Sequence, residues 1–171
     1  LSRIASLYLA PTLEFLRTLP ASAVLPIFIL AMGLTTEMII SVIAFGSLWP
    51  VLLSTVHGFR ALERRLLEVA ANFELGRAES FIKITLPSAI PDILAGARVS
   101  LGFALILSIV AEMLSSKPGL GNNILLASRS FKSADLYAGI VVLGLLGALT
   151  TGVLGIIENR LLRWRPSADQ D

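Results

Sequence analysis

The stretch LYAGIVVLGLLGALTTGVLGII, residues 136–157, contains no charged side chain. A helix needs about 20 mainly apolar residues to cross the hydrocarbon core of a bilayer, so this stretch predicts a membrane-spanning helix. Residues 18–36 and 38–57 also lack Asp, Glu, Lys and Arg. Residues 91–113 reach spanning length if the Arg98 side chain extends to the nearer membrane interface.

The composition favours a membrane protein with a single domain. The chain has 171 residues, of which 55% are hydrophobic and only 15% are charged. Its mean hydropathy is +0.81, which soluble domains rarely reach. It contains no cysteine and has a net charge of +2, so neither thiolate chemistry nor nucleic-acid binding is expected. We predict an all-α, polytopic helix bundle over residues 1–171, with Pro20 and Pro26 interrupting its first span.

Basic residues border the apolar stretches unequally. The larger group lies between the second and third stretches and after the fourth: Arg60, Arg64, Arg65, Arg77, Lys83, Arg160, Arg163 and Arg165. The connection between the third and fourth stretches holds Lys117, Arg129 and Lys132. Cytoplasmic loops carry the excess of Lys and Arg. We therefore predict that residues 60–88 lie on the cytoplasmic side and residues 114–135 on the outer side.

The predicted cytoplasmic segment contains EVAANFELGRAESFIKITLP, residues 68–87. Helical spacing places one set of apolar side chains on a common face: Leu66, Val69, Ala70 and Phe73. Gly76 is a plausible stop for this helix. Residues 78–86 read as a second short helix, which Pro87 separates from the next span. The pattern predicts a polar helix–turn–helix that projects from the membrane toward a soluble partner.

This segment resembles the EAA loop of ABC importer permeases, whose motif is E-A-A-x3-G-x9-I-x-L-P. The matching positions are Glu68, Ala70, Ile84, Leu86 and Pro87. Val69 replaces one alanine, and Glu74 stands at the position of the motif glycine. Because Gly76 is the nearest glycine, we expect the turn to be shifted by two residues.

The resemblance covers essentially the whole chain and indicates the nitrate, sulfonate and taurine branch. It rests on these further stretches: Leu16-Arg17-Thr18-Leu19-Pro20, Trp49-Pro50, Gly96-Ala97-Arg98, Ala111-Glu112-Met113, Gly119-Leu120-Gly121 and Glu158…Trp164. Permeases of this branch have about six helices. The chain matches the part from the end of the second helix onward. We therefore expect an N-terminally truncated permease domain.

The resemblance implies a multi-pass permease subunit of the cytoplasmic (inner) membrane. It would form a homodimer, bind an ABC ATPase inside and a substrate-binding protein outside, and move a small anion such as a sulfonate, taurine or nitrate. It would need no cofactor or metal of its own, and the chain lacks a P-loop. The residues expected to dock the ATPase are Glu68, Ala70, Ala71, Phe73, Gly76, Ile84, Leu86 and Pro87.

A few residues in the predicted spans are candidates for other roles. Arg98 could attract an anionic solute, extend to the interface or pair with Asp92. Glu112 is a candidate for solute contact or gating. His57 is the only histidine, and a lone histidine does not make a metal site. Small residues recur every four positions in the last span, which favours helix packing within the bundle, with a subunit interface or chance as alternatives: Gly144, Ala148 and Gly152, and Gly147, Thr151 and Gly155.

Three other interpretations stay open at this stage. The chain could be a permease for another class of solute, or a structural or non-functional membrane fragment. It could also be an intramembrane enzyme, but this would require acid, histidine or cysteine clusters facing one another, and the sequence pattern shows none.

Overall fold

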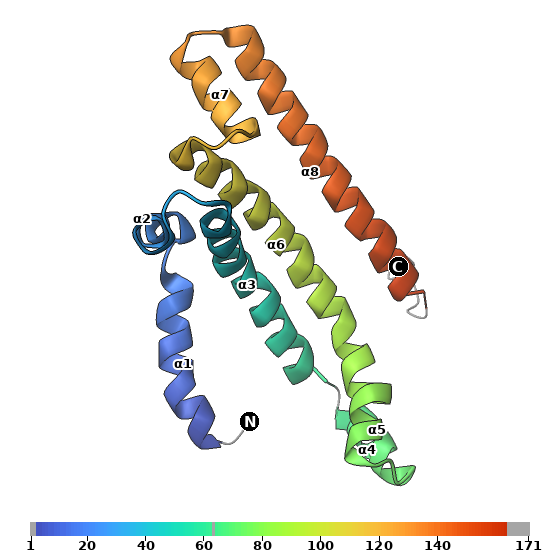
Figure 1. Ribbon diagram of the computed structural model, residues 1–171. Coiled ribbons are helices and arrows are strands. Elements are labelled where there is room, and N and C mark those ends of the chain that lie inside the picture. Colours follow the sequence, from blue (N-terminus) through green and yellow to red (C-terminus); the bar gives the residue numbers. More distant parts are fainter. Residues whose placement is uncertain (1–2, 63, 164–171) are drawn as a thin grey trace. The chain divides into compact units, whose positions relative to one another are not determined.

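The computed structural model describes residues 3–62 and 64–163, and every regular element in these residues is a helix (Figure 1). The elements are α1 (Arg3–Thr18), α2 (Ala21–Met32), α3 (Thr36–Arg60), α4 (Arg64–Asn72), α5 (Arg77–Ser80), the π-helix η1 (Phe81–Thr85), α6 (Leu86–Ser115), α7 (Leu120–Arg129) and α8 (Ser133–Leu161). The all-α prediction is therefore confirmed. The chain forms two compact units, and the long helices contribute to both.

Three helical segments are long and apolar enough to cross a membrane among the described residues: Thr36–Arg60, Arg77–Ser115 and Ser133–Leu161. They contain the apolar stretches expected at residues 38–57, 91–113 and 136–157. Each extends past its stretch because a helix satisfies its own backbone hydrogen bonds in lipid and in water alike.

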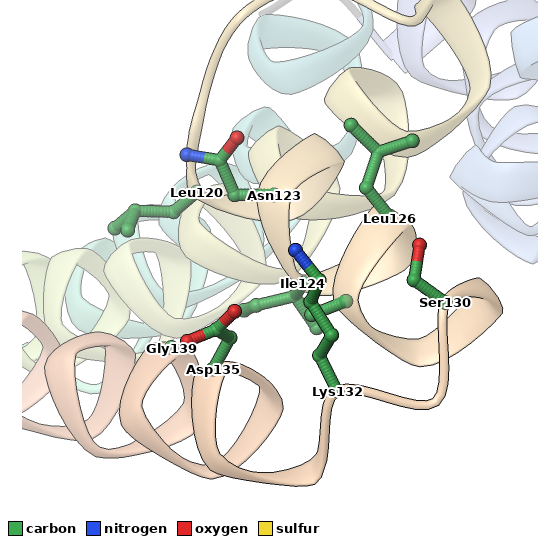
Figure 2. Close-up of a pocket in the computed structure, with 9 residues that line it drawn as sticks. Leu120, Asn123, Ile124, Leu126, Ser130, Lys132, Asp135 and Gly139 are labelled. Carbon is green, nitrogen blue, oxygen red and sulfur yellow. The ribbon is translucent and has the colours of Figure 1, made fainter.

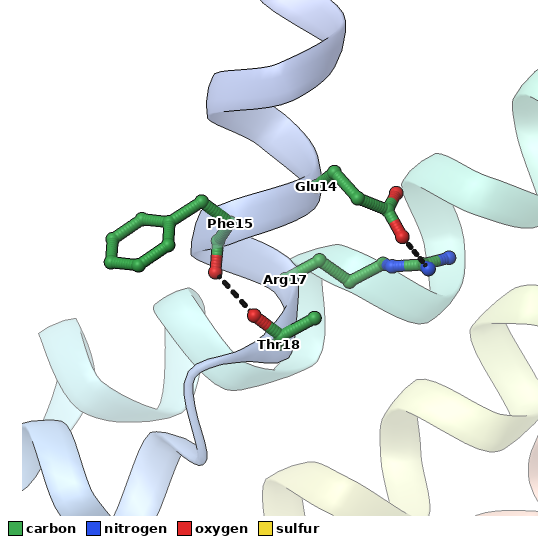
Figure 3. Close-up of polar contacts among 4 residues, drawn as sticks. All are labelled: Glu14, Phe15, Arg17 and Thr18. Atoms are coloured by element: carbon green, nitrogen blue, oxygen red, sulfur yellow. Dashed lines mark hydrogen bonds and ion pairs between the residues drawn. The ribbon is translucent and has the colours of Figure 1, made fainter.

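The first expected span, residues 18–36, is not a single helix. α1 and α2 meet at an angle of 93° and could form a fourth span only as a bent pair. Pro20 precedes α2 with extended backbone, and proline has no N–H to continue the helix before it. At the end of α1, the Thr18 hydroxyl donates to the Phe15 carbonyl at 2.8 Å, and Arg17 pairs with Glu14 (Figure 3).

The first unit contains the hydrophobic core. Its buried side chains come from α2, α3 and the second half of α6: Leu25, Met38, Val42, Leu107 and Ala111. Gly46 of α3 lies directly against Leu107, and a Cβ at this glycine would overlap the leucine side chain. Small residues thus let these helices approach closely, as expected where lipid rather than water surrounds a bundle.

The second unit contains a similar close contact between α3 and α6. A Cβ at Gly96 would lie 2.6 Å from the Ser54 Cβ and 2.9 Å from the Pro50 carbonyl oxygen. A Cβ at Gly58 would lie 2.9 Å from the Asp92 Cβ. Two glycines, one on each helix, therefore hold α3 and α6 at short range.

The prediction that the small residues of α8 pack within the bundle is wrong for the part of the chain that the structure describes. A Cβ at Gly144, Gly152 or Gly155 would meet no heavy atom within 4 Å. The close packing occurs between α3 and α6 instead. Spacing alone could not distinguish these helices, because it shows which residues share a face but not what that face contacts.

Replacement of Gly96 by alanine should push α3 and α6 apart and lower the free energy of unfolding by about 1–3 kcal/mol. Gly102→Ala is a matched control on the same helix, because a Cβ there meets nothing within 4 Å. This control should be neutral or stabilising by up to about 1 kcal/mol, because alanine favours helix more than glycine does. Thermal unfolding in detergent measures both, and equal losses in the two variants would contradict the α3–α6 contact.

Candidate functional site

The polar segment between the α3 and α6 spans folds into a hairpin, which we define as residues 64–85. It consists of α4, a turn, α5 and η1, and α4 packs against η1. The rings of Phe59, near the end of α3, and Phe81, in η1, stack with centroids 5.9 Å apart and planes at 19°. This stack joins the hairpin to the helix that precedes it.

One face of α4 is turned inward and the opposite face is open. Ala70 is buried, whereas Glu68 is exposed and forms no ion pair with any side chain that the structure describes. Ala71 lies in α4, but its side chain is outside the described part. Phe73 follows the last residue of α4 and is 74% exposed. Glu68 and Phe73 are therefore both available to a partner.

The turn after α4 is formed at Glu74 and not at Gly76. Glu74 has φ +52°, in the left-handed region that favours glycine. The Leu75 N–H donates to the Ala70 carbonyl at 3.0 Å, which closes the end of the helix. Gly76 has φ −60°, and a Cβ there would meet nothing within 4 Å. The expected shift of the turn and the expected stop at Gly76 are both wrong, because the backbone keeps the position of the motif glycine although glutamate occupies it.

The expected break at Pro87 is also absent, since residues Arg77–Ser115 form one helical segment. Within η1 the hydrogen bonds span five residues, and the Leu86 N–H donates to the Phe81 carbonyl. Pro87, which has no N–H, comes directly after this wider turn. The Ser88 hydroxyl donates to the Ile84 carbonyl at 2.7 Å. The π-turn therefore lets the hairpin continue into α6 without a break.

Exposed apolar side chains gather in the hairpin. Phe73, Phe81 and Ile82 are 74%, 47% and 63% exposed. Ile84, Leu86 and Pro87 are only half-exposed or less, so these three motif positions contribute to the start of α6 more than to an open surface. Phe81 and Ile82 were not among the predicted site residues. Their apolar character within a polar segment was the available signal.

The structure places Arg98 in an ion pair with Glu158 of α8. Of the three alternatives for Arg98, pairing with Asp92 is not the one found. Asp92 instead faces His57, with the Oδ1 and Nδ1 atoms 3.6 Å apart. Among the described residues, no group of three or more His, Cys, Asp or Glu side chains could hold a metal ion. Arg98 therefore has a carboxylate partner of its own, which weakens its case as a solute contact.

Glu112 lies in the first unit, near the end of α6. One of its oxygens accepts from the Gly121 N–H at the start of α7, at 2.9 Å. A pocket lies between α7 and the start of α8 and is lined by residues of both (Figure 2). Lys132 and Asp135 line it beside Ile124, and they form no ion pair with each other. The carboxylate of Glu112 is thus used within the chain, while the pocket is lined by one side chain of each charge sign.

Residues 1–163 match the family described as binding-protein-dependent transport system inner membrane component. The chain belongs to this family. Its fold is therefore that of a multi-pass membrane component of a transport system, which is the family predicted from the EAA-like segment.

The chain is also similar to permeases whose names state a solute. A candidate aliphatic sulfonates transport permease of Bacillus subtilis (strain 168), SsuC, is 39% identical over 97% of this chain and 60% of its own length. Its counterpart in Escherichia coli (strain K12) is 34% identical over 98% of this chain and 64% of its own length. A nitrate import permease of Leptolyngbya laminosa, NrtB, is 30% identical over 90% of this chain and 55% of its own length. The chain thus spans less than two thirds of the length of these family members.

Replacement of Glu74 by glycine should stabilise the hairpin by about 1 kcal/mol, because it removes the cost of a left-handed side-chain-bearing residue. Glu74→Ala is the matched control. It removes the same charge but keeps a Cβ at φ +52°, so it should give no gain. Hydrogen exchange of the α4 amides, followed by mass spectrometry, measures the difference. Equal protection in the two variants would show that the charge of residue 74, and not its backbone conformation, determines the stability of the hairpin.

Proposed function

We propose that this chain is the membrane-spanning permease subunit of an ATP-driven ABC importer. The observation that supports this most strongly is the combination of family membership with the hairpin, an exposed polar segment that continues into the apolar helix α6. The chain would carry solute and would not hydrolyse ATP itself. Hydrolysis would take place in a separate ATPase subunit on the cytoplasmic side.

The hairpin would bind the ATPase subunit. Phe73 and Ile82 expose apolar surface that a groove could cover, and Glu68 offers an exposed carboxylate. A basic residue of the ATPase would pair with Glu68 as the interface closes. Aromatic anchors surrounded by polar side chains are typical of the residues that carry most of the binding energy in protein interfaces.

The transported solute would be a small anion such as a sulfonate, taurine or nitrate. This proposal rests on the names of the relatives, two of which are sulfonate permeases and one a nitrate permease. A substrate-binding protein would deliver the solute to the outer face, which holds residues 114–135. The pairing of Arg98 with Glu158 argues for recognition of the anion by other groups.

The importer would contain two copies of the permease in the cytoplasmic (inner) membrane, with the pathway between them. Gly144, Gly152 and Gly155 of α8 have no close neighbour among the described residues, so their face is available for contact with another helix or with lipid. The excess of basic side chains around the hairpin supports a cytoplasmic position for this segment, because cytoplasmic loops carry more Lys and Arg.

Charge reversal at Glu68 tests the function directly. A buried charge left without its partner costs about 3–5 kcal/mol, so Glu68→Lys should abolish co-purification with the tagged ATPase subunit and ATP-driven uptake. Asp135→Lys is the matched control, because it reverses an exposed carboxylate outside the hairpin. The control should keep the complex. Unchanged uptake by the Glu68→Lys permease would rule out the docking role of this residue.

A further inference from the structure

The N-terminus of α7 is capped by a side chain of another helix. Its N-cap residue, Gly119, has no side chain that could accept a hydrogen bond. The carboxylate of Glu112, on α6, takes this role by accepting from the Gly121 N–H at 2.9 Å. The Ser108 hydroxyl donates a long hydrogen bond, 3.4 Å, to the other oxygen of Glu112. A negative charge at the start of a helix is stabilising, because it satisfies free N–H groups and the helix dipole.

The two glycines before and after Leu120 make room for this arrangement. Gly119 has an extended backbone, with φ 175°, which any residue can adopt. A Cβ at Gly119 would nevertheless overlap the Glu112 carboxylate, and a Cβ at Gly121 would overlap the Ile109 carbonyl oxygen. Gly119 is therefore needed for space beside Glu112, and Gly121 for contact with the α6 backbone.

α7 also makes a close contact with α8 at a glycine. A Cβ at Gly139 would lie 2.6 Å from the Ile124 Cγ1, and Figure 2 shows Ile124 and Gly139 at the same pocket. α7 therefore contacts α6 through Gly121 and α8 through Ile124. The Glu112–Gly121 hydrogen bond is a tie between α7 and α6 that uses a charged group, and such bonds are roughly twice as strong as neutral ones.

We propose that Glu112 is a positioning residue that ties α7 to the end of α6, so that α7 moves with α6 during the transport cycle. This inference rests on the proposed function. The helical segment that ends at Ser115 begins in the hairpin at Arg77. When the end of α6 is displaced in the transport cycle, the Glu112 tie would pass that displacement to the start of α7. A role of Glu112 as a solute contact is the alternative, and its carboxylate is already occupied.

The tie is tested first without transport, by hydrogen exchange of the chain in lipid nanodiscs. Glu112→Ala should raise the exchange rate of the α7 amides about tenfold, the loss expected for a hydrogen bond to a charged group, and leave residues 144–157 unchanged. Glu112→Gln keeps an acceptor oxygen and should stay close to wild type. Gly119→Ala should act like Glu112→Ala by displacing the carboxylate.

The double variant is the sharpest control. With the carboxylate gone, a Cβ at residue 119 has nothing to displace, so Gly119→Ala with Glu112→Ala should exchange no faster than Glu112→Ala alone. Additive effects in the double variant, or unchanged α7 exchange in Glu112→Ala, would overturn the proposal. If Glu112→Ala fails to fold, Gly119→Ala alone decides, because it retains the glutamate.

The role in transport is read from the solute imported per ATP hydrolysed, with aliphatic sulfonate as the probe. Glu112→Ala should keep the ATPase bound and lower this ratio, because α7 no longer follows α6, while Glu112→Gln retains most of it. An equal loss in both variants with α7 protection intact would assign Glu112 to the solute and overturn the tie. If the wild-type chain binds no ATPase, the proposed function fails, whereas the exchange experiment still decides whether Glu112 holds α7.

Discussion

The link between the hairpin and its membrane span depends on one constraint, the continuity of the helix from the hairpin into α6. Residues Arg77–Ser115 form a single helical segment even though Pro87 and Pro91 lie within it. A break at this point would leave backbone groups unpaired at the membrane surface and would disconnect the hairpin from the span. The π-turn at Phe81–Thr85 prevents the break by placing Pro87 where the hydrogen-bond spacing changes. Turns of this kind occur frequently at functional sites.

Polar side chains in and near the spans are used as ties between helices. Arg98 pairs with Glu158, His57 faces Asp92, and Glu112 accepts a hydrogen bond from α7. Charges within membrane helices are costly unless they are paired. The two candidates for solute contact, Arg98 and Glu112, therefore have partners inside the chain. Glycines supply the second means of contact, because they allow α3, α6 and α7 to approach one another closely.

The sequence predicted the helical class and the position of the long apolar helices. An uncharged apolar run long enough to cross a bilayer must be helical, because a helix satisfies its own backbone hydrogen bonds in lipid. It also located the hairpin, but it did not predict the form of the turn. The left-handed backbone of Glu74 follows from how α4 ends, and glutamate rarely adopts it. The capping of α7 by Glu112 joins residues nine positions apart through a turn, so no local spacing rule indicates it. The sequence showed the spacing of the small residues in α8, but it did not show which residues surround them.

Docking of an ATPase requires the hairpin to lie on the cytoplasmic side of the membrane, and labelling of single cysteines determines this side. The chain has no cysteine, so a single cysteine at exposed Ala78 or at exposed Ser130 reports one position each. A membrane-impermeant maleimide should label Ala78→Cys only in inside-out vesicles and Ser130→Cys only in intact spheroplasts. Labelling of Ala78→Cys from the outside would contradict the account, because no ATPase could then reach the hairpin.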